Sequence, residues 1–370
     1  MKILLITLEY PPKIGGIASY TYNFAAHFDS EEICVYAPKQ QGDKEFDAKN
    51  DWKTYRYNPY FKVIWPRWLK MFWQVRKIIK KEKVEKIYVH HALPSGYVAY
   101  LCKKFFKIPY TIFFHGTDLV VGLKRKAGKI KMVCNNAEKI VVSGDFLKNK
   151  LSAKFEELEN KIVVLHPCPS DFFLKKNKEE ELEILRAKLA LKGKKVLISV
   201  GRMADGKGFP HMVRLLPKIL EKVPNLVWII IGDGPKKEDI IKNIQKNYLQ
   251  NVVRILGFIP LNELPKYYQL ADAFVLLTHK DEESEEGWGT AFLEASASGL
   301  PVIAGRVGGV EEVVENLVTG ILVDVYQDQG VISAITEILK NSDYAKQMGE
   351  AGRRRIIQEF NWEKQIAKLE

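Results

Sequence analysis

Residues 195–208 read Lys-Val-Leu-Ile-Ser-Val-Gly-Arg-Met-Ala-Asp-Gly-Lys-Gly. A run of aliphatic and β-branched residues leads into a glycine-rich loop, and a helical pattern over Phe209–Lys222 follows directly. A buried strand, a glycine loop and a helix in this order form one repeat of a doubly wound α/β domain. We therefore expect the loop at the carboxyl edge of a parallel sheet, where such domains bind ligands.

Similar apolar runs recur on both sides of this repeat, with helical patterns between them. Runs nearly unbroken by polar residues suit strands buried on both faces, and alternation with helices predicts parallel sheets. The first series of expected strands is Ile3–Thr7, Lys86–Val89, Tyr110–Phe114, Lys139–Val142 and Ile162–Leu165. The second series is Lys195–Val200, Leu226–Ile231, Val252–Leu256, Ala273–Leu277, Pro301–Ala304 and Gly320–Val323.

The two series are separated by residues 168–194, which contain two prolines and a charged run. A chain of 370 residues fits two domains of average size. We expect an N-terminal domain over 1–172 and a C-terminal domain over 173–354, with a helix at about 355–370 packed back on the first. Two doubly wound, Rossmann-like domains facing each other would leave a ligand-binding cleft between them.

The net charge of +12 is unevenly distributed along the chain. Residues 1–170 carry 29 basic and 16 acidic side chains, or +13, and the remainder carries 28 and 29, or −1. A basic half indicates an anionic partner, either a nucleic acid or a membrane surface. A general preference of this chain for lysine is the alternative explanation.

The cysteines and the apolar runs bear on the compartment. Cys34, Cys102, Cys134 and Cys168 stand far apart and lack zinc-site spacing, so we expect reduced thiols. No apolar run approaches the roughly 18 residues that a membrane span needs, and the first residues lack a signal-peptide core. These features predict a cytoplasmic protein whose contact with the inner face of the cytoplasmic membrane is peripheral.

The loop at 201–208 nearly matches the P-loop pattern of nucleotide triphosphatases. Gly208 stands where that pattern needs a serine or threonine to bind magnesium, which argues against such an enzyme. Arg202 and Lys207 remain as two cations suited to a phosphate group, since arginine forks across phosphate oxygens and lysine supplies a point charge.

Three other polar segments follow expected strands. Gly15 and Gly16 lie between the first strand and a helix, where the backbone could approach an anion or simply turn. His115-Gly-Thr-Asp118 follows a buried strand, and either its histidine or its aspartate could line a cleft or cap the next helix. Gly232-Asp-Gly234 could lie under a nucleotide base or form a tight turn.

The segment Glu286-Gly-Trp-Gly-Thr-Ala-Phe-Leu-Glu294 carries the strongest signal. The amides of Gly289 and Thr290 are expected at a helix N-terminus, ready for diphosphate oxygens. Glu294, one turn into that helix, can accept hydrogen bonds from both hydroxyls of a ribose. Four neighbouring carboxylates are better explained as a solvated acidic patch: Asp281, Glu282, Glu283 and Glu285.

In order and spacing, these motifs resemble those of retaining glycosyltransferase family 4, which has the GT-B fold. Glu286 and Glu294 are similar to its E-x7-E element, and residues 201–208 to its G-R-x4-K-G phosphate motif. Residues 10–17 look like its N-terminal glycine loop, 115–118 like its H-G-x-[ED] motif, and 349–353 with 360–362 like its closing helices. Residues 165–171 depart from the N-G-V-D that many members carry at the hinge.

The resemblance implies a role for each motif. Arg202 and Lys207 would neutralise the departing diphosphate, Glu294 would bind the ribose and Glu286 the donor sugar, and His115 would lie beside the anomeric carbon. It also implies retention of anomeric configuration by front-face attack within an ion pair, with no settled covalent nucleophile. The donor side would further include Gly16, Gly232, Gly234, Gly289 and Thr290, and the acceptor side Gly15, Ile17 and Asp118. The chain has no D-x-D motif, so we expect neither a metal nor another cofactor.

A basic aromatic segment and two loops bear on the identity of the acceptor and the donor. Residues 60–83 interleave Trp65, Trp68, Phe72, Trp73, Ile78 and Ile79 with basic residues, a pattern typical of a membrane surface or of an ordinary core-facing helix with a basic outer face. The loops at 10–17 and 301–305 are most similar to those of phosphatidylinositol mannoside mannosyltransferases, which implies mannose from GDP-mannose and a lipid-linked or glycan acceptor. No separate nucleic-acid motif is present.

Other functions remain as alternatives. One is a UDP-sugar-dependent transferase of glucose, N-acetylglucosamine or galactose in cell-surface polysaccharide synthesis. Others are an epimerase or phosphorylase of the same fold, or a non-enzymatic protein that binds a membrane or nucleic acid through its basic half.

Overall fold

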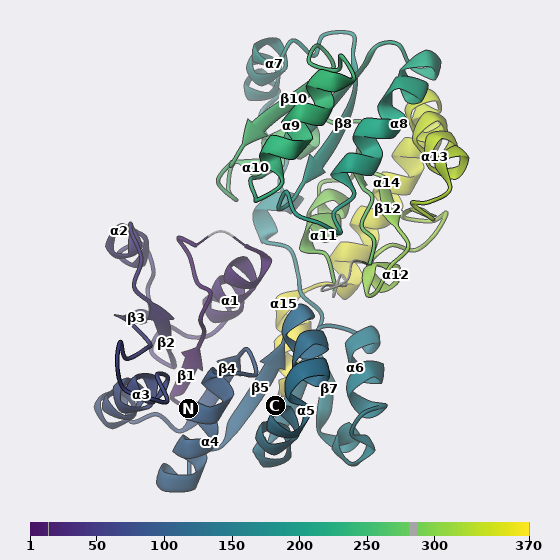
Figure 1. Cartoon of the computed structure of the whole chain (residues 1–370). Coiled ribbons are helices and arrows are strands. Elements are labelled where there is room, and N and C mark those ends of the chain that lie inside the picture. The colour runs from purple at the N-terminus through teal and green to yellow at the C-terminus, as the bar shows by residue number, and fades with distance from the viewer. Residues whose placement is uncertain (14, 281–287, 370) are drawn as a thin grey trace. The chain divides into compact units, whose positions relative to one another are not determined.

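A computed structural model describes residues 1–13, 15–280 and 288–369. The chain forms two compact units, one of Met1–Pro167 with Trp362–Glu370 and one of Cys168–Asn361 (Figure 1). The division lies five residues before the expected one because Leu165 is buried in unit 1, whereas Phe173 packs against Tyr268 of unit 2. The return to unit 1 begins at Trp362, not at about 355, because α14 (Ser342–Glu359) packs on unit 2.

Unit 1 is built on a seven-stranded parallel sheet in the order β3-β2-β1-β4-β5-β6-β7. Two of its strands, β2 and β3, were not among those expected. Strand β3, KTYRY, has polar residues and no buried residue, whereas β2 is an apolar run of six residues that was overlooked. The order reverses between β1 and β4, so a topological switch point lies where these two strands end. The strands are β1 Ile3–Ile6, β2 Ile33–Pro38, β3 Lys53–Tyr57, β4 Lys86–His90, β5 Tyr110–Phe114, β6 Lys139–Val142 and β7 Ile162–Val164.

Helices connect the strands of unit 1 and cover its sheet. They are α1 Gly16–Ala26, α2 Asp43–Asp47, α3 Leu69–Glu82, α4 Ser95–Phe106, α5 Thr117–Asn136 and α6 Asp145–Ser152, with a 3-10 turn at Glu156–Lys161. The chain end adds α15 (Trp362–Ile366) and a 3-10 turn at Ala367–Leu369 (yellow in Figure 1). The ring of Trp362 lies 5.2 Å from that of Tyr20 on α1, and Lys139 Nζ donates to the Leu369 carbonyl at 2.7 Å.

Unit 2 is built on a six-stranded parallel sheet in the order β10-β9-β8-β11-β12-β13. Its switch point lies between β8 and β11, where the loops after these two strands share one edge. The strands are β8 Lys195–Val200, β9 Leu226–Ile231, β10 Val253–Gly257, β11 Ala273–Leu276, β12 Val302–Gly305 and β13 Gly320–Val323. The helices are α7 Glu179–Lys188, α8 Phe209–Lys222, α9 Lys237–Lys246, α10 Leu264–Gln269, α11 Thr290–Ala297, α12 Val310–Val313, α13 Asp328–Lys340 and α14, with a 3-10 turn at Asp171–Leu174.

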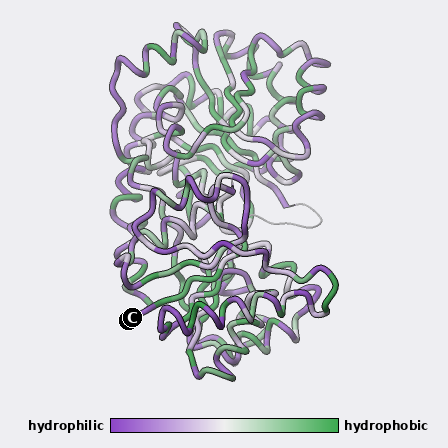
Figure 2. The backbone as a smooth tube through the Cα atoms, turned by 90° about the vertical axis from the view of Figure 1, so that its left-hand side faces the viewer, coloured by the Kyte–Doolittle hydropathy of each residue, from purple (hydrophilic) through white to green (hydrophobic). Residues whose placement is uncertain are grey.

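Each unit has its own apolar core. Every residue of β9 is buried, as expected for a central strand of a parallel sheet, and hydrophobic residues gather in the interior of each unit (Figure 2). The predicted doubly wound α/β class is confirmed for both units. Over the described residues, no helix is long and apolar enough to cross a membrane.

Candidate active site

The glycine loop of unit 1 joins β1 to α1 at the switch point of its sheet. Gly15 caps α1 with φ of 155°, and Gly16 is the exposed first residue of the helix. Ile17 follows in the first turn and is half-buried. Gly15, Gly16 and Ile17 therefore lie together at a helix N-terminus, where free amides favour an anion.

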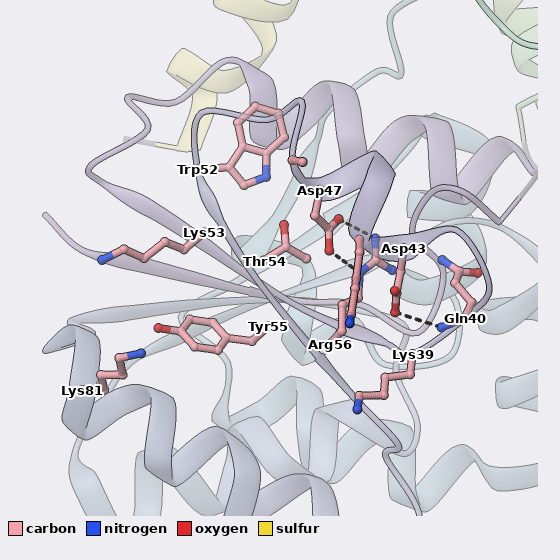
Figure 3. Close-up of a pocket in the computed structure, with 12 residues that line it drawn as sticks. Lys39, Gln40, Asp43, Asp47, Trp52, Lys53, Thr54, Tyr55, Arg56 and Lys81 are labelled. Atoms are coloured by element: carbon pink, nitrogen blue, oxygen red, sulfur yellow. Dashed lines mark hydrogen bonds and ion pairs between the residues drawn. The ribbon is translucent and has the colours of Figure 1, made fainter.

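Residues of β3 and of the preceding segment 39–52 line an open cavity of about 850 Å³ (Figure 3). Some of these residues also hold the glycine loop in place. Arg56 pairs with Asp47 through two hydrogen bonds of 2.8 and 2.9 Å, donates to the Pro11 carbonyl and lies 5.2 Å from the centre of the Tyr10 ring. Gln40 Nε2 donates to the Tyr10 carbonyl at 2.7 Å. This polar network anchors the strand-proximal half of the glycine loop.

His115 follows β5 and belongs to a cluster of three histidines. Its Nε2 lies 3.0 Å from Nδ1 of His90, the last residue of β4, and the ring of His91 lies 5.7 Å from its own. His90 and His91 were not among the expected site residues, although two histidines at the end of the apolar run Lys86–Val89 were a signal in the sequence. The edge of the Tyr20 ring packs on His115, with 4.9 Å between ring centres.

Burial dominates the electrostatics of this cluster. It lowers the pKa of His90 and of His115 well below the usual value, and the neighbouring histidines lower both further. Both rings are therefore neutral at physiological pH.

Asp118 turns its carboxylate back onto the loop that carries His115. Its Oδ1 accepts from the His115 backbone N–H at 2.9 Å, and burial raises its pKa. The bond holds the residues just before α5, whose cap, Gly116, receives no side-chain hydrogen bond. A role of Asp118 on the acceptor side stays a prediction.

In unit 2, the loop at 201–208 is held by backbone contacts on both sides. The Met203 N–H donates to the Asp233 carbonyl at 2.9 Å, and the His279 N–H donates to the Gly206 carbonyl at 2.9 Å. Arg202 is exposed and makes no ion pair with the described part of the chain, whereas Lys207 is half-buried. The two cations expected to bind a phosphate group thus lie on one loop that backbone hydrogen bonds hold in place at the switch point of unit 2.

The glycines of 232–234 have a packing explanation. A Cβ on Gly232 would lie 2.0 Å from the Gly201 carbonyl oxygen, and one on Gly234 would lie 2.4 Å from that of Met203. The lack of a side chain at both positions therefore allows the loops after β8 and β9 to pack closely against each other. This packing is a structural reason for glycine here, as in the tight-turn alternative. Nucleotide binding by these two glycines stays a prediction.

Helix α11 carries the third element expected on the donor side. Gly289, with φ of 77°, caps it, Thr290 is its first residue, and Glu294 is buried one turn later. The hydroxyl of Tyr268 on α10 donates to Glu294 Oε2 at 2.9 Å. Burial raises the pKa of Glu294 to about 7, and the bond from Tyr268 opposes that rise. Tyr268 was not among the expected site residues, because no sequence pattern links it to Glu294, 26 positions away.

Two expectations concern residues or groups that the structure does not describe. Glu286 and the acidic residues 281–285 lie outside the described residues. Over the described residues, no cluster of three or more His, Cys, Asp or Glu side chains could hold a metal ion, and metal independence stays a prediction.

The basic aromatic segment at 60–83 divides into two parts. Phe72, Ile78 and Ile79 are buried in the core of unit 1, so the membrane interpretation is wrong for them. Trp68 stacks on Tyr97 with 5.2 Å between ring centres. The exposed large hydrophobic side chains of the segment are Tyr60 at 43%, Val63 at 94%, Ile64 at 54%, Trp65 at 84% and Trp73 at 46%, and Phe105 on α4 is 61% exposed.

Comparison with known families covers nearly the whole chain. A model described as "Glycosyltransferase Family 4" matches residues 14–168, and one described as "Glycosyl transferases group 1" matches residues 181–355.

Curated relatives span the full length at low identity. The GDP-mannose-dependent alpha-(1-6)-phosphatidylinositol monomannoside mannosyltransferase of Mycolicibacterium smegmatis is 26% identical and aligns over 99% of this chain and 97% of its own. The N-acetyl-alpha-D-glucosaminyl L-malate synthase of Bacillus anthracis is 24% identical over 87% of this chain and 81% of its own.

A solved structure shows the same fold. Anabaena HepE in complex with UDP-glucose superposes with a TM-score of 0.82 at 18% identity and covers 100% of this chain and 98% of its own.

Proposed function

The chain belongs to the GT-B glycosyltransferases that join a family 4 domain to a group 1 domain, and we propose that it transfers mannose from GDP-mannose to a hydroxyl of a lipid-linked acceptor. The mannosyl donor is supported by the mannosyltransferase that aligns over 99% of the chain. A UDP-sugar is the second candidate donor, because the solved structure of the same fold, Anabaena HepE, is a complex with UDP-glucose.

The observation that carries the donor site is the buried pair of Glu294 and Tyr268 beside the N-terminus of α11. Tyr268 occupies one carboxylate oxygen and leaves acceptor capacity for the hydroxyls of a ribose. Amides of Gly289 and Thr290 would receive the diphosphate, and Arg202 and Lys207 would neutralise the charge that develops on it as the sugar departs. Such preorganised charge stabilises the transition state more than the ground state.

A thermal-shift panel tests the donor. GDP-mannose should raise the Tm more than UDP-glucose, UDP-N-acetylglucosamine or UDP-galactose, because a ligand that binds only the folded state stabilises it. Glu294→Gln should remove the shift, and Glu238→Gln, an exposed glutamate on α9, should keep it. A larger shift with a UDP-sugar would replace the mannosyl donor by that sugar, and no shift with any of the four would contradict the proposed function.

We further propose that transfer retains the anomeric configuration and needs neither metal nor cofactor. The absence of a D-x-D motif from the sequence supports the second point. With a transfer assay in hand, NMR of the product should show the α configuration of the donor, and excess EDTA should leave the rate unchanged. A β product would refute retention of configuration. A loss of rate that Mg²⁺ or Mn²⁺ restores would refute metal independence.

The lipid-linked acceptor implies contact with a membrane, and we propose the segment around Trp65 as the contact. Three consecutive apolar side chains, Val63, Ile64 and Trp65, are exposed and flanked by basic residues of the +13 half. Interfacial aromatics and cations together favour an anionic lipid surface.

Vesicle sedimentation tests this surface. The protein should bind phosphatidylglycerol vesicles at low salt and lose binding at high salt, because exposed charges are screened. Trp65→Ser should weaken binding, whereas Tyr248→Ser, an equally exposed aromatic change in unit 2, should not. Equal binding of both variants and the parent protein would exclude Trp65 from the contact.

A further inference from the structure

His90 has no part in the family motif, yet its side chain bonds directly to His115. It ends β4 with no exposed surface, and its ring stacks on Phe113 with 4.3 Å between ring centres. The Nδ1 atom of His90 and the Nε2 atom of His115 are 3.0 Å apart. Two ring nitrogens at this distance share one hydrogen, so one of them must present a lone pair.

The other nitrogen of His90 indicates where that hydrogen lies. Nε2 of His90 is buried and has no hydrogen-bond partner in the described part of the chain. A buried N–H group without an acceptor is rarer in proteins than an acceptor without a donor. The neutral His90 ring therefore carries its hydrogen on Nδ1, which points at His115.

We propose that His90 is a positioning residue that donates from Nδ1 to Nε2 of His115 and holds His115 as the neutral tautomer protonated on Nδ1. In this arrangement His115 cannot gain a second proton without losing the bond to His90. The groups that face the pair are His91 from the end of β4, Asp118 from α5 and Tyr20 from α1.

The consequence for catalysis rests on the proposed function. Transfer from a nucleotide sugar builds positive charge on the anomeric carbon, and an imidazolium beside that carbon would repel it. A neutral His115 with a free Nδ1–H can instead donate a hydrogen bond to a sugar oxygen. His90 thus keeps a cation out of the site while leaving a donor in it.

NMR of the ¹⁵N-labelled full chain tests the proposal without any substrate, so its outcome is independent of the proposed function. The chain has only seven histidines, and His115 is assigned by loss of its signals in His115→Gln. We expect a pyrrole-type shift for Nδ1 and a pyridine-type shift for Nε2 of His115, unchanged between about pH 8 and about pH 5. A pyrrole-type Nε2 in the parent protein would overturn the proposal.

Two substitutions distinguish the effect of the His90–His115 hydrogen bond on the tautomer of His115 from the effect of burial. His90→Phe keeps an aromatic ring on Phe113 but removes the donor, and the Nε2 signal of His115 should move toward the pyrrole type. His90→Asn places an amide N–H near the position of Nδ1 and should restore the parental shifts. His211→Phe in unit 2 is the control and should leave His115 unchanged. If His115 keeps the parental tautomer, protonated on Nδ1, in His90→Phe, burial alone sets its state and the proposal is wrong.

Discussion

Glu294 shows at the scale of one residue how burial links stability to pH. Its folded-state pKa of about 7 lies above its ordinary value of 4.5, so folding favours the protonated form. The associated stability is complete below pH 4.5 and is lost progressively as pH rises from 4.5 through 7, a total of about 3 kcal/mol. In the proposed donor site the carboxylate form of Glu294 binds the ribose, so we expect the opposite pH dependence for donor binding.

The first prediction is that the stability of the protein and its affinity for the donor change in opposite directions with pH. As pH rises through 7, the Tm of the ligand-free protein should lose the contribution of Glu294 while its affinity for the donor rises. Differential scanning fluorimetry and calorimetric titration between about pH 4.5 and about pH 8 measure the two quantities.

Substitutions at the pair identify the group responsible. Glu294→Gln should abolish both trends, and Tyr268→Phe should move the midpoint of donor binding to higher pH, because the phenol lowers the pKa of Glu294. An unchanged midpoint in Tyr268→Phe would show that another group controls the affinity.

At the scale of elements, the β1–α1 loop depends on β3, a strand at the far edge of its sheet. Arg56 on β3 is paired with Asp47 and contacts Pro11 and Tyr10, and Trp52 Nε1 donates to the Tyr10 hydroxyl at 3.0 Å. The loop is therefore fixed by residues that follow it by about 30 to 45 positions in the chain.

The second prediction is that Arg56→Met loosens this loop. Methionine keeps most of the apolar stem but removes the bonds to Asp47 and the Pro11 carbonyl, a loss of about 1–3 kcal/mol. Amide hydrogen exchange should rise in residues 9–19 and stay unchanged in β5 and β6.

Arg254→Met on β10 provides the comparison for this prediction, since within the described residues Arg254 donates only to carbonyls at positions 250, 251 and 253. It should leave exchange in residues 9–19 as it is. Equal exchange in Arg56→Met and the parent protein would mean that the loop is held by other contacts.

At the scale of the whole molecule, the chain passes between its two units twice, after Pro167 and after Asn361. The second passage returns Trp362 to the first unit, where its ring packs against those of Tyr20, Phe24 and His27. Unit 1 therefore completes its core with residues that follow the whole of unit 2.

The third prediction is that Trp362→Ala destabilises unit 1 by about 3–5 kcal/mol, as expected for truncation of a buried aromatic ring. Hydrogen exchange measured during thermal unfolding should show the loss of stability in β1 and α1, which lie far from Trp362 in the sequence. Trp65→Ala, which truncates an 84% exposed tryptophan, should change the stability little. Similar Tm values for both variants would refute the proposed contribution of Trp362.

The sequence determined the features that depend on local pattern. Strand–loop–helix repeats, glycines at strand ends and the order of the motifs predicted the α/β class and the glycosyltransferase family, and both are confirmed. Local pattern suffices for these because a parallel sheet requires apolar strands alternating with helices, and its loops converge on one edge.

Only the tertiary structure decided which side chains meet across those repeats. The bond between His90 and His115, the bond between Tyr268 and Glu294 and the bracing of Pro11 by Arg56 join residues 25 to 45 positions apart. Each bond depends on the relative position of two elements, which packing fixes and no periodicity encodes. Burial likewise set the charge states of His115 and Glu294, since a pKa depends on the depth at which a group finally lies.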